Sequence, residues 1–409
     1  MTALHICYQS VLEPLTQTQV LPYLHGLAKA GHRVVLLTFE PRRLTTAETR
    51  NGQQSLAARG IVWHWRRYHK RPTLPATAWD ALVGVLTAWW LVRRHKVRLV
   101  HARSHVPGAM ALILKHLTGA KLLLDVRGLM AEEYVDAGVW PANGLLFRIT
   151  KRLERALFGA ADAIVVLTER AKEHFLECYP RETANKPLIT IPCCVDLRPR
   201  TNDSRTLRSQ PNGPKTMVYV GKLGGWYMTD AMADFMATAI RMIPGLRWQV
   251  WTQSDPRPLR QLLAQRGVHG KVAINSSPPD ELPARLRGAM AGLSLRAPGR
   301  SARAASPTKV GEYLAAGLPV IANVGVGDTD ALLSGQSAPD HAPVGVLVRQ
   351  FSDDAYREAL RELITLRHDP HLSRQCQKAA QRHFDLERVG WARYRQIYDN
   401  LIGTPTESQ

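Results

Sequence analysis

Short apolar runs alternate with amphipathic stretches along the first half of the chain, and this pattern predicts a parallel α/β sheet. The first predicted strand covers residues 4–8, and a predicted helix over 17–30 follows it and ends at Gly31. The same pattern predicts further strands at 34–39, 61–65, 98–102, 121–126 and 163–167. Helical segments lie between most of these strands, as a parallel sheet requires.

A polar stretch at residues 198–215, RPRTNDSRTLRSQPNGPK, interrupts this alternation. It is rich in Pro, Asn and Ser and has no apolar periodicity, which is typical of a linker. The alternation then restarts, with strands predicted at 216–220, 246–252, 272–275, 291–295 and 319–322. The sequence therefore predicts a second α/β domain after the linker.

The end of the chain predicts an amphipathic helix whose apolar face needs a partner. From residue 383 onward, apolar residues recur every three or four positions at Trp391, Tyr394, Ile397, Tyr398 and Leu401. A length of 409 residues also favours two hydrophobic cores over one. We therefore expect an N-terminal domain at 1–197, a linker at 198–215, a C-terminal domain at 216–382 and a final helix at 383–409.

The chain is strongly basic, with 54 Lys and Arg against 34 Asp and Glu and a formal net charge of +20. Such a charge attracts the phosphates of nucleotides, nucleic acids or anionic lipids. We expect no nucleic-acid partner, because no zinc spacing, recognition-helix pattern or aromatic-glycine RNA motif is present. The five cysteines have no paired short spacing, and the start resembles no export signal, so we expect a cytoplasmic protein.

The segment SPTKVGEYLAAGLPVIA, residues 306–322, combines a helix start with two charged side chains. Ser306 is expected to cap a helix with Pro307 at its first position, and Gly317 ends it. Lys309 and Glu312 are three residues apart, so they share a helix face near its positive end. A lysine there can meet phosphate while a carboxylate accepts sugar hydroxyls. Alternatively, the two side chains simply pair with each other on a solvated face.

This segment resembles the donor-site motif of family 4 glycosyltransferases in a bacterial branch with a PTK-type motif. The resemblance implies the glycosyltransferase B fold, with two facing Rossmann-like domains, a cleft between them and a C-terminal helix that crosses back to the N-terminal domain. It also implies retaining transfer of sugar from a nucleoside diphosphate, with Glu312 contacting the ribose and with no metal or other cofactor. The commonest form of the motif has another glutamate eight residues earlier, where this chain has Ala304, so the identity of the sugar stays open.

A second resemblance begins the C-terminal half, where MVYVGKLGGWYMTDAM from Met217 is similar to the glycine-rich turn that meets donor phosphates in these enzymes. Trp226 and Tyr227 are either packing aromatics or ligand contacts. Arg296, which follows an apolar strand, is expected to be a second phosphate ligand. The donor-binding residues expected from both segments are Gly221, Lys222, Gly224, Gly225, Arg296, Ser306, Thr308, Lys309 and Glu312.

In the N-terminal half, VHARSHVPGAMAL from Val100 and LLLDVRGLMAEEYVDAGVW from Leu122 resemble acceptor-side segments of the same branch. Arg127 stands where many relatives carry a histidine, and we expect it to stabilise the leaving diphosphate or to bind an acidic acceptor. Asp125, Glu132 or Glu133 would handle the acceptor proton. His105 is either a base or sugar ligand, or a capping or buried structural histidine. The expected acceptor-side residues are Gln17, Thr18, Gln19, Arg103 and Glu132.

Residues 63–96 mix tryptophans and basic clusters around an apolar run at 81–92. This run is shorter than the roughly 20 residues of a membrane-spanning helix. With Trp89 and Trp90 it predicts either a helix that docks on an anionic membrane or a core helix. Docking would bring the enzyme to a lipid-linked glycan at the inner face of the membrane.

The sequence therefore predicts a glycosyltransferase that moves a hexose-type sugar to a lipid-linked or polysaccharide acceptor in cell-surface glycan biosynthesis. Two alternatives stay open. The first is a sugar-nucleotide epimerase or hydrolase on the same fold. The second is a binding scaffold that has lost catalysis, which the alanine at position 304 suggests.

Overall fold

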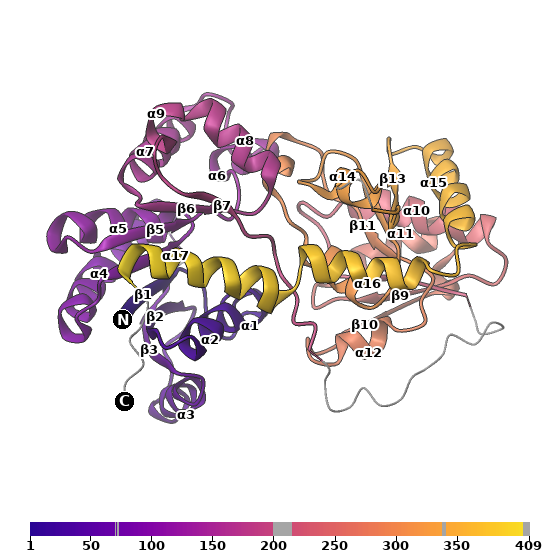
Figure 1. Cartoon of the computed structure of the whole chain (residues 1–409). Helices are drawn as coiled ribbons and strands as arrows, with labels where there is room; N and C mark the ends of the chain where they lie inside the picture. The colour runs from indigo at the N-terminus through magenta and orange to yellow at the C-terminus, as the bar shows by residue number, and fades with distance from the viewer. Residues whose placement is uncertain (70, 72, 199–214, 338–340, 404–409) are drawn as a thin grey trace. The chain divides into compact units, whose positions relative to one another are not determined.

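The computed structural model describes the whole chain except residues 70, 72, 199–214, 338–340 and 404–409. Two compact units make up the chain: unit 1 combines Met1–Pro192 with Leu386–Gln409, and unit 2 is Cys193–Asp385 (Figure 1). The chain thus passes into unit 2 before the predicted linker at 198–215, and it returns to unit 1 at Leu386 instead of residue 383. Most of that predicted linker lies outside the described residues.

Unit 1 contains a parallel sheet with the strand order β3-β2-β1-β4-β5-β6-β7. Its strands are β1 (Thr2–Cys7), β2 (Arg33–Glu40), β3 (Ile61–Arg67), β4 (Leu99–Arg103), β5 (Lys121–Asp125), β6 (Ala163–Val166) and β7 (Leu188–Thr190). Its helices are α1 (Pro14–Gln19), α2 (Leu21–Lys29), α3 (Thr46–Ala57), α4 (Thr73–His95), α5 (His105–Thr118), α6 (Met130–Asp136), α7 (Leu145–Ala160), α8 (Glu169–Cys178), α9 (Pro180–Thr183) and α17 (Ala392–Ile402), the last preceded by the π-helical segment η3 (Leu386–Trp391).

Unit 2 contains a second parallel sheet, with the order β10-β9-β8-β11-β12-β13. Its strands are β8 (Thr216–Val220), β9 (Arg247–Trp251), β10 (Val272–Asn275), β11 (Gly292–Ser294), β12 (Val320–Asn323) and β13 (Gly345–Val348). Its helices are α10 (Thr229–Met242), α11 (Arg257–Gln265), α12 (Leu282–Leu286), α13 (Thr308–Ala315), α14 (Thr329–Leu333), α15 (Asp353–Leu366) and α16 (Leu372–His383), with 3-10 turns η1 (His269–Lys271) and η2 (Arg300–Ala304).

Every strand expected from the sequence is present within one or two residues of its predicted ends. The sequence pattern missed β7 and β13, which are short edge strands of three and four residues. The helix predicted over 17–30 is two helices, because the chain leaves helical geometry at Val20, where ψ is −64° with a φ of −127°. Pro22 then lies in the first turn of α2, a position that needs no amide hydrogen.

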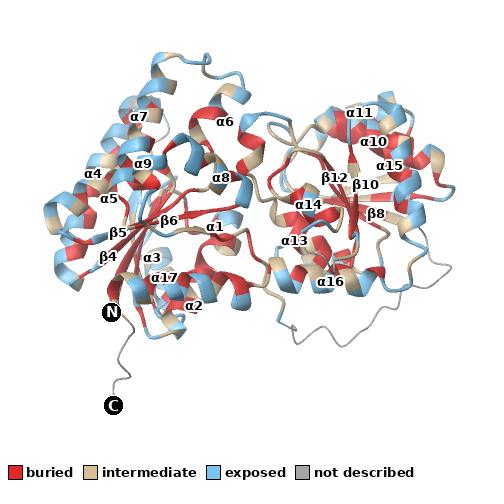
Figure 2. Cartoon of the chain, turned by 45° about the horizontal axis from the view of Figure 1, so that its top comes forward, coloured by how far each residue is buried: buried red, intermediate tan, exposed pale blue. Residues whose placement is uncertain are grey.

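The order of both sheets reverses beside their first strand, at β1–β4 in unit 1 and at β8–β11 in unit 2. In Figure 2 the strands of both sheets are largely buried, so their apolar side chains form the cores. Ligands of parallel α/β sheets bind beyond the carboxyl ends of the strands at such a reversal. The loops after β1, β4, β8 and β11 are therefore the places to look for a functional site.

The end of the chain packs against α2 in unit 1, and this contact supplies the partner that its apolar face needs. The Trp391 indole nitrogen donates to the Pro22 carbonyl at 2.9 Å. The Tyr394 ring meets Tyr23 edge-on at 5.5 Å between centroids. A Cβ added to Gly26 would lie 2.4 Å from the Trp391 ring, so only glycine leaves room for this indole.

We predict that Gly26→Ala destabilises unit 1 by about 1–3 kcal/mol, because the new methyl group overlaps the Trp391 ring. In most helix interiors the same change stabilises a protein by up to about 1 kcal/mol. Gly159 is a matched control, since it lies in α7 with no atom closer than 3.9 Å to its added Cβ. Urea unfolding of both variants measures the difference, and equal stability changes would contradict the packing described here.

Candidate functional site

The glycine-rich turn after β8 holds its backbone in conformations that favour glycine. Gly221, Gly224 and Gly225 have φ values of +131°, +78° and +58°. The Gly224 amide donates to the Thr229 hydroxyl at 2.9 Å, which ties the turn to the start of α10. The side chain of Lys222 is exposed, and its carbonyl accepts a hydrogen bond from the Tyr219 hydroxyl. The Lys222 backbone is thus fixed beside the end of β8.

Helix α13 begins at Thr308, one residue later than expected, with Pro307 at its N-cap. The prediction that Ser306 caps this helix is wrong. Its hydroxyl instead accepts a hydrogen bond from the Cys193 amide at 3.1 Å, so the start of unit 2 competes for the capping oxygen. Thr308 is half-buried at the first helical position.

Tyr313 fixes α13 onto the sheet at the reversal. Its hydroxyl accepts from the Val220 amide at 2.8 Å and donates to the Leu293 carbonyl at 3.2 Å, so it connects the ends of β8 and β11. A Cβ on Gly292 would lie 2.3 Å from its ring. Sequence patterns did not identify this anchor, because nothing local shows that a glycine and a tyrosine 21 residues apart interlock.

Lys309 is buried with 4% exposure, and its ammonium has no hydrogen-bond partner among the described residues. It therefore does not pair with Glu312, which is half-buried on the same helix face. Burial lowers the pKa of Lys309 to about 7, against the opposing effect of Glu312. Burial likewise raises the pKa of Glu312 to about 7, which Lys309 opposes. A solvated surface pair is thus excluded for these two residues.

Arg296 brings a second cation close to this lysine. Its amide donates to the Asn323 side-chain oxygen at 2.8 Å, which fixes the loop after β11. Its guanidinium carbon lies 5.5 Å from the centre of the Trp226 ring, and its Nε has no hydrogen-bond partner in the described part of the chain. Arg296 also lowers the pKa of Lys309, as expected for two nearby cations.

In unit 1, the residues expected at the strand ends form an ion-paired charge cluster. Asp125 and Arg103 lie opposite each other on β5 and β4, and the guanidinium is 3.3 Å from the carboxylate. Arg127 reaches the other carboxylate oxygen at 3.3 Å. Burial acts to raise the pKa of Asp125, but Arg127, His101 and Arg103 outweigh it and hold that pKa well below its usual range. A carboxylate in this setting is a poor proton acceptor.

Two buried histidines, which the sequence analysis did not identify, lie next to this cluster. His5 and His101 are register partners on β1 and β4, with ring centroids 4.4 Å apart. His101 shares a 2.9 Å hydrogen bond with the Tyr398 hydroxyl of α17. Burial lowers the pKa of both imidazoles. Only the pairing of the strands shows that these histidines are neighbours.

His105 belongs to a separate buried group between α5 and α7. Its Nε2 is 3.3 Å from a Glu154 carboxylate oxygen, and Lys151 and the Tyr179 hydroxyl bind the other oxygen. Lys151 also contacts Glu132 at 3.0 Å. Of the alternatives considered for His105, this environment is that of a buried structural histidine.

Two of the residues of α1 that we expect on the acceptor side use their side chains for hydrogen bonds within their own segment. The Gln17 side-chain Nε2 donates to the Val11 carbonyl at 2.6 Å, and the Thr18 hydroxyl donates to the Pro14 carbonyl at 2.9 Å. Gln19 is buried. These contacts shape the loop after β1, where many α/β proteins bind a ligand.

The apolar run predicted at 81–92 is part of the longer helix α4, of which Pro75–His95 has the length and composition to cross a membrane. Of its most apolar window, 44% is buried. Its outer face exposes Trp79, Leu82, Leu86, Trp89 and Trp90.

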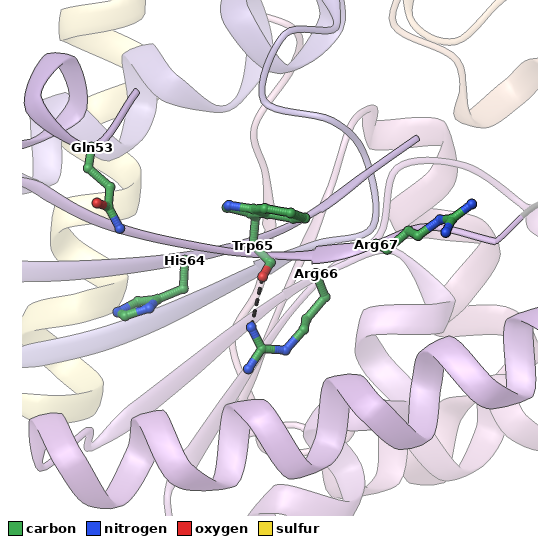
Figure 3. A pocket seen from close by; sticks show the side chains of 5 residues that line it. All are labelled: Gln53, His64, Trp65, Arg66 and Arg67. Carbon is green, nitrogen blue, oxygen red and sulfur yellow. Dashed lines mark hydrogen bonds between the residues drawn. The ribbon is translucent and has the colours of Figure 1, made fainter. Parts of the chain in front are cut away.

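Beside this helix, the open edge of β3 lines a cavity of about 420 Å³ (Figure 3). Its lining residues are Gln53, His64, Trp65, Arg66 and Arg67. Arg66 donates through Nε to the Thr87 hydroxyl of α4 at 2.8 Å, so the cationic edge and the apolar helix are physically joined.

We predict that Asp125→Asn destabilises unit 1 by about 3–5 kcal/mol at pH 7, because two buried guanidinium groups lose their counter-ion. The depressed pKa means that Asp125 contributes stability above its unfolded pKa, near 4, and loses it at lower pH. The gap between wild type and variant should therefore shrink below about pH 4. Urea unfolding at several pH values measures it. Asp255→Asn, in an exposed pair with Arg257, is the control, and an equal effect there would contradict the prediction.

Comparison with known proteins adds two findings. Residues 16–192 match the family described as Glycosyl transferase 4-like domain. The sequence matches no curated protein.

Solved structures with the same fold cover 98% of this chain. Sucrose-phosphate synthase from Thermosynechococcus elongatus is 16% identical, is covered over 98% of its chain and has a TM-score of 0.69. Anabaena HepE in complex with UDP-glucose is 14% identical, is covered over 100% and has a TM-score of 0.67. WaaG, a glycosyltransferase involved in lipopolysaccharide biosynthesis, is 18% identical, is covered over 100% and has a TM-score of 0.63.

These similarities show the two-domain, Rossmann-like glycosyltransferase B fold. The domain match covers residues 16–192, less than half of the chain, so the similarity to a Glycosyl transferase 4-like domain holds for unit 1.

Proposed function

We propose that this protein transfers a hexose-type sugar, with retention, from a nucleoside-diphosphate donor to a lipid-linked or polysaccharide acceptor in cell-surface glycan biosynthesis. The observation that carries the proposal is the pair of cations at the sheet reversal of unit 2, the buried Lys309 and the half-buried Arg296, which have no acidic hydrogen-bond partner among the residues that the structure describes. Positive charge of this kind needs an anion, and a diphosphate supplies one. The solved complex of HepE with UDP-glucose supports this donor class.

In the proposed donor complex, Lys309 and Arg296 bind the diphosphate, and the amides of the turn at Gly221, Gly224 and Gly225 approach it closely. Glu312 accepts hydrogen bonds from the ribose. No metal or other cofactor is part of this proposal, since the protein's own cations carry the charge of the leaving group.

For the acceptor side we propose that Arg127 stabilises the leaving diphosphate or an acidic acceptor. Asp125 orients it, since the carboxylate is 3.3 Å from this guanidinium and its pKa is lowered. Glu132 is a better candidate than Asp125 for the acceptor proton, because one of its buried oxygens has no hydrogen-bond partner among the described residues. The name of WaaG, with its link to lipopolysaccharide, supports a glycan acceptor of this general kind.

We further propose that unit 1 docks on an anionic membrane from the cytoplasmic side through the exposed face of α4. Trp79, Leu82 and Leu86 expose between 52% and 60% of their surface. The Arg93 guanidinium stacks on the Trp89 ring at 5.0 Å, so apolar and cationic groups share this face. Aromatic side chains flanked by arginines suit the boundary between acyl chains and anionic headgroups.

The proposed transfer predicts that Lys309→Ala and Glu312→Ala each lower turnover by at least about a hundredfold, because the donor loses charge stabilisation or ribose contacts. Incubation with a panel of sugar nucleotides and a lipid extract, followed by mass analysis, detects the product. Lys271→Ala, an exposed lysine of unit 2, should leave turnover unchanged. Full activity in both site variants would refute the proposal. Sugar release or epimerisation without acceptor would favour an epimerase or hydrolase, and no nucleotide binding would favour a scaffold.

The docking proposal predicts at least about tenfold weaker binding to vesicles of phosphatidylglycerol and phosphatidylcholine when Arg67, Arg93 and Arg94 are all changed to Gln. All three side chains are exposed. The control variant changes three exposed arginines of unit 2, Arg260, Arg361 and Arg374, which removes the same total charge. Vesicle sedimentation compares the two. Equal losses would show that net charge, and not the α4 face, drives binding.

A further inference from the structure

Two cations at the proposed donor site are held by aromatic rings instead of carboxylates. The Lys309 ammonium lies 4.2 Å from the centre of the Tyr219 ring and 4.3 Å from that of Tyr227. The Arg296 guanidinium lies 5.5 Å from the Trp226 ring. These rings belong to β8 and to the turn that follows it, so one short segment serves both cations.

A ring attracts a cation through its quadrupole, without neutralising the charge and without a carboxylate to compete for the N–H donors. Burial raises the pKa of both tyrosine hydroxyls, which therefore stay neutral and offer no negative charge to the lysine. The charged groups that act on Lys309 are Glu312, on its own helix, and Arg296, on the loop after β11. The Glu312 carboxylate, the acceptor of the two, forms no hydrogen bond with the ammonium.

The position of the lysine also depends on the turn. A Cβ on Gly221 would lie 3.0 Å from the Lys309 Nζ, so a larger residue there would displace the ammonium from its position between the rings. The loop that carries Arg296 is fixed to the same segment, because the Ala297 amide donates to the Trp226 carbonyl at 2.8 Å. Backbone and rings together hold both cations in place before any ligand arrives.

We propose that Tyr219, Trp226 and Tyr227 form an aromatic cradle that positions Lys309 and Arg296, un-neutralised, for a diphosphate. The inference rests on the proposed donor site and names the residues that prepare it. An arginine or lysine held by a carboxylate must break that pair before it binds phosphate, whereas a cation on a ring keeps its donors available. Tyr227 is thus a positioning residue that acts through Lys309. The lowered pKa of Lys309 fits this setting, because Glu312 offsets only part of the effect of burial.

The test is a double-mutant cycle on nucleotide affinity, measured by calorimetry with UDP, GDP, ADP and inorganic diphosphate and completed with the tightest of them. Tyr227 is only partly buried, so it is the ring to change. Tyr227→Leu should weaken binding by roughly tenfold in the wild-type background. In a Lys309→Met background the same change should have little effect, because the ring acts through the lysine. Tyr227→Phe keeps the ring and should bind like wild type.

Equal losses from Tyr227→Leu with and without Lys309 would overturn the cradle, as would unchanged affinity in Tyr227→Leu. A loss in Tyr227→Phe equal to that in Tyr227→Leu would also overturn it, because the hydroxyl and not the ring face would then matter. If Tyr227→Leu fails to fold, as thermal unfolding would show, Trp226→Leu against an Arg296→Met background repeats the cycle. Failure of the wild-type protein to bind any of the four probes would refute the donor site itself, which separates the two proposals.

Discussion

The reversal of strand order beside β1 and β8 is the constraint on which both candidate sites depend. Parallel strands all end on the same edge of a sheet, and at the reversal the connections on either side leave in opposite directions. In unit 2 this opens space for the turn at Gly221 and the start of α13. In unit 1 it brings the ends of β1 and β4 together, with Arg103 beside Asp125 of the next strand. Each site is thus a consequence of topology before it is one of side-chain chemistry.

The two units use charge at these positions in opposite ways. In unit 1, Asp125 forms ion pairs with both Arg103 and Arg127 in a largely buried cluster. In unit 2, Lys309 and Arg296 have no carboxylate partner within the described part of the chain, and both lie against aromatic rings instead. Cations that are paired with a carboxylate stabilise a fold and are held in place, whereas cations without a carboxylate partner gain most from an incoming anion. The contrast fits the proposal that unit 2 binds the anionic donor, whereas the ion-paired arginines of unit 1 are held in place within the domain.

The C-terminal segment, η3 and α17, packs into the interior of unit 1. Tyr398 of α17 bonds to His101, and Trp391 fills the space above Gly26. The residues around Asp125 are therefore supported by a helix some 270 residues later in the chain, since Tyr394 and Tyr398 pack on His101. A substitution that disrupts α17 should therefore alter the packing around the charge cluster, although no residue of α17 belongs to the expected site.

The sequence alone determined the succession of strands and helices, because apolar periodicity and glycine positions act over a few residues. It also determined that Lys309 and Glu312 share one helix face, since helical spacing fixes that relation. It erred where two segments compete for one atom, as when the Cys193 amide takes the Ser306 hydroxyl from the expected cap.

Only the tertiary structure decided whether each charge is neutralised. The sequence allowed Lys309 and Glu312 to be either donor ligands or a surface pair. It likewise allowed Asp125 to be a base. Their neighbours, Tyr219 and Tyr227 for the lysine and Arg103 and Arg127 for the aspartate, come together through strand order and register. The electrostatic environment of a buried group depends on all elements packed around it, and local sequence specifies only one of them.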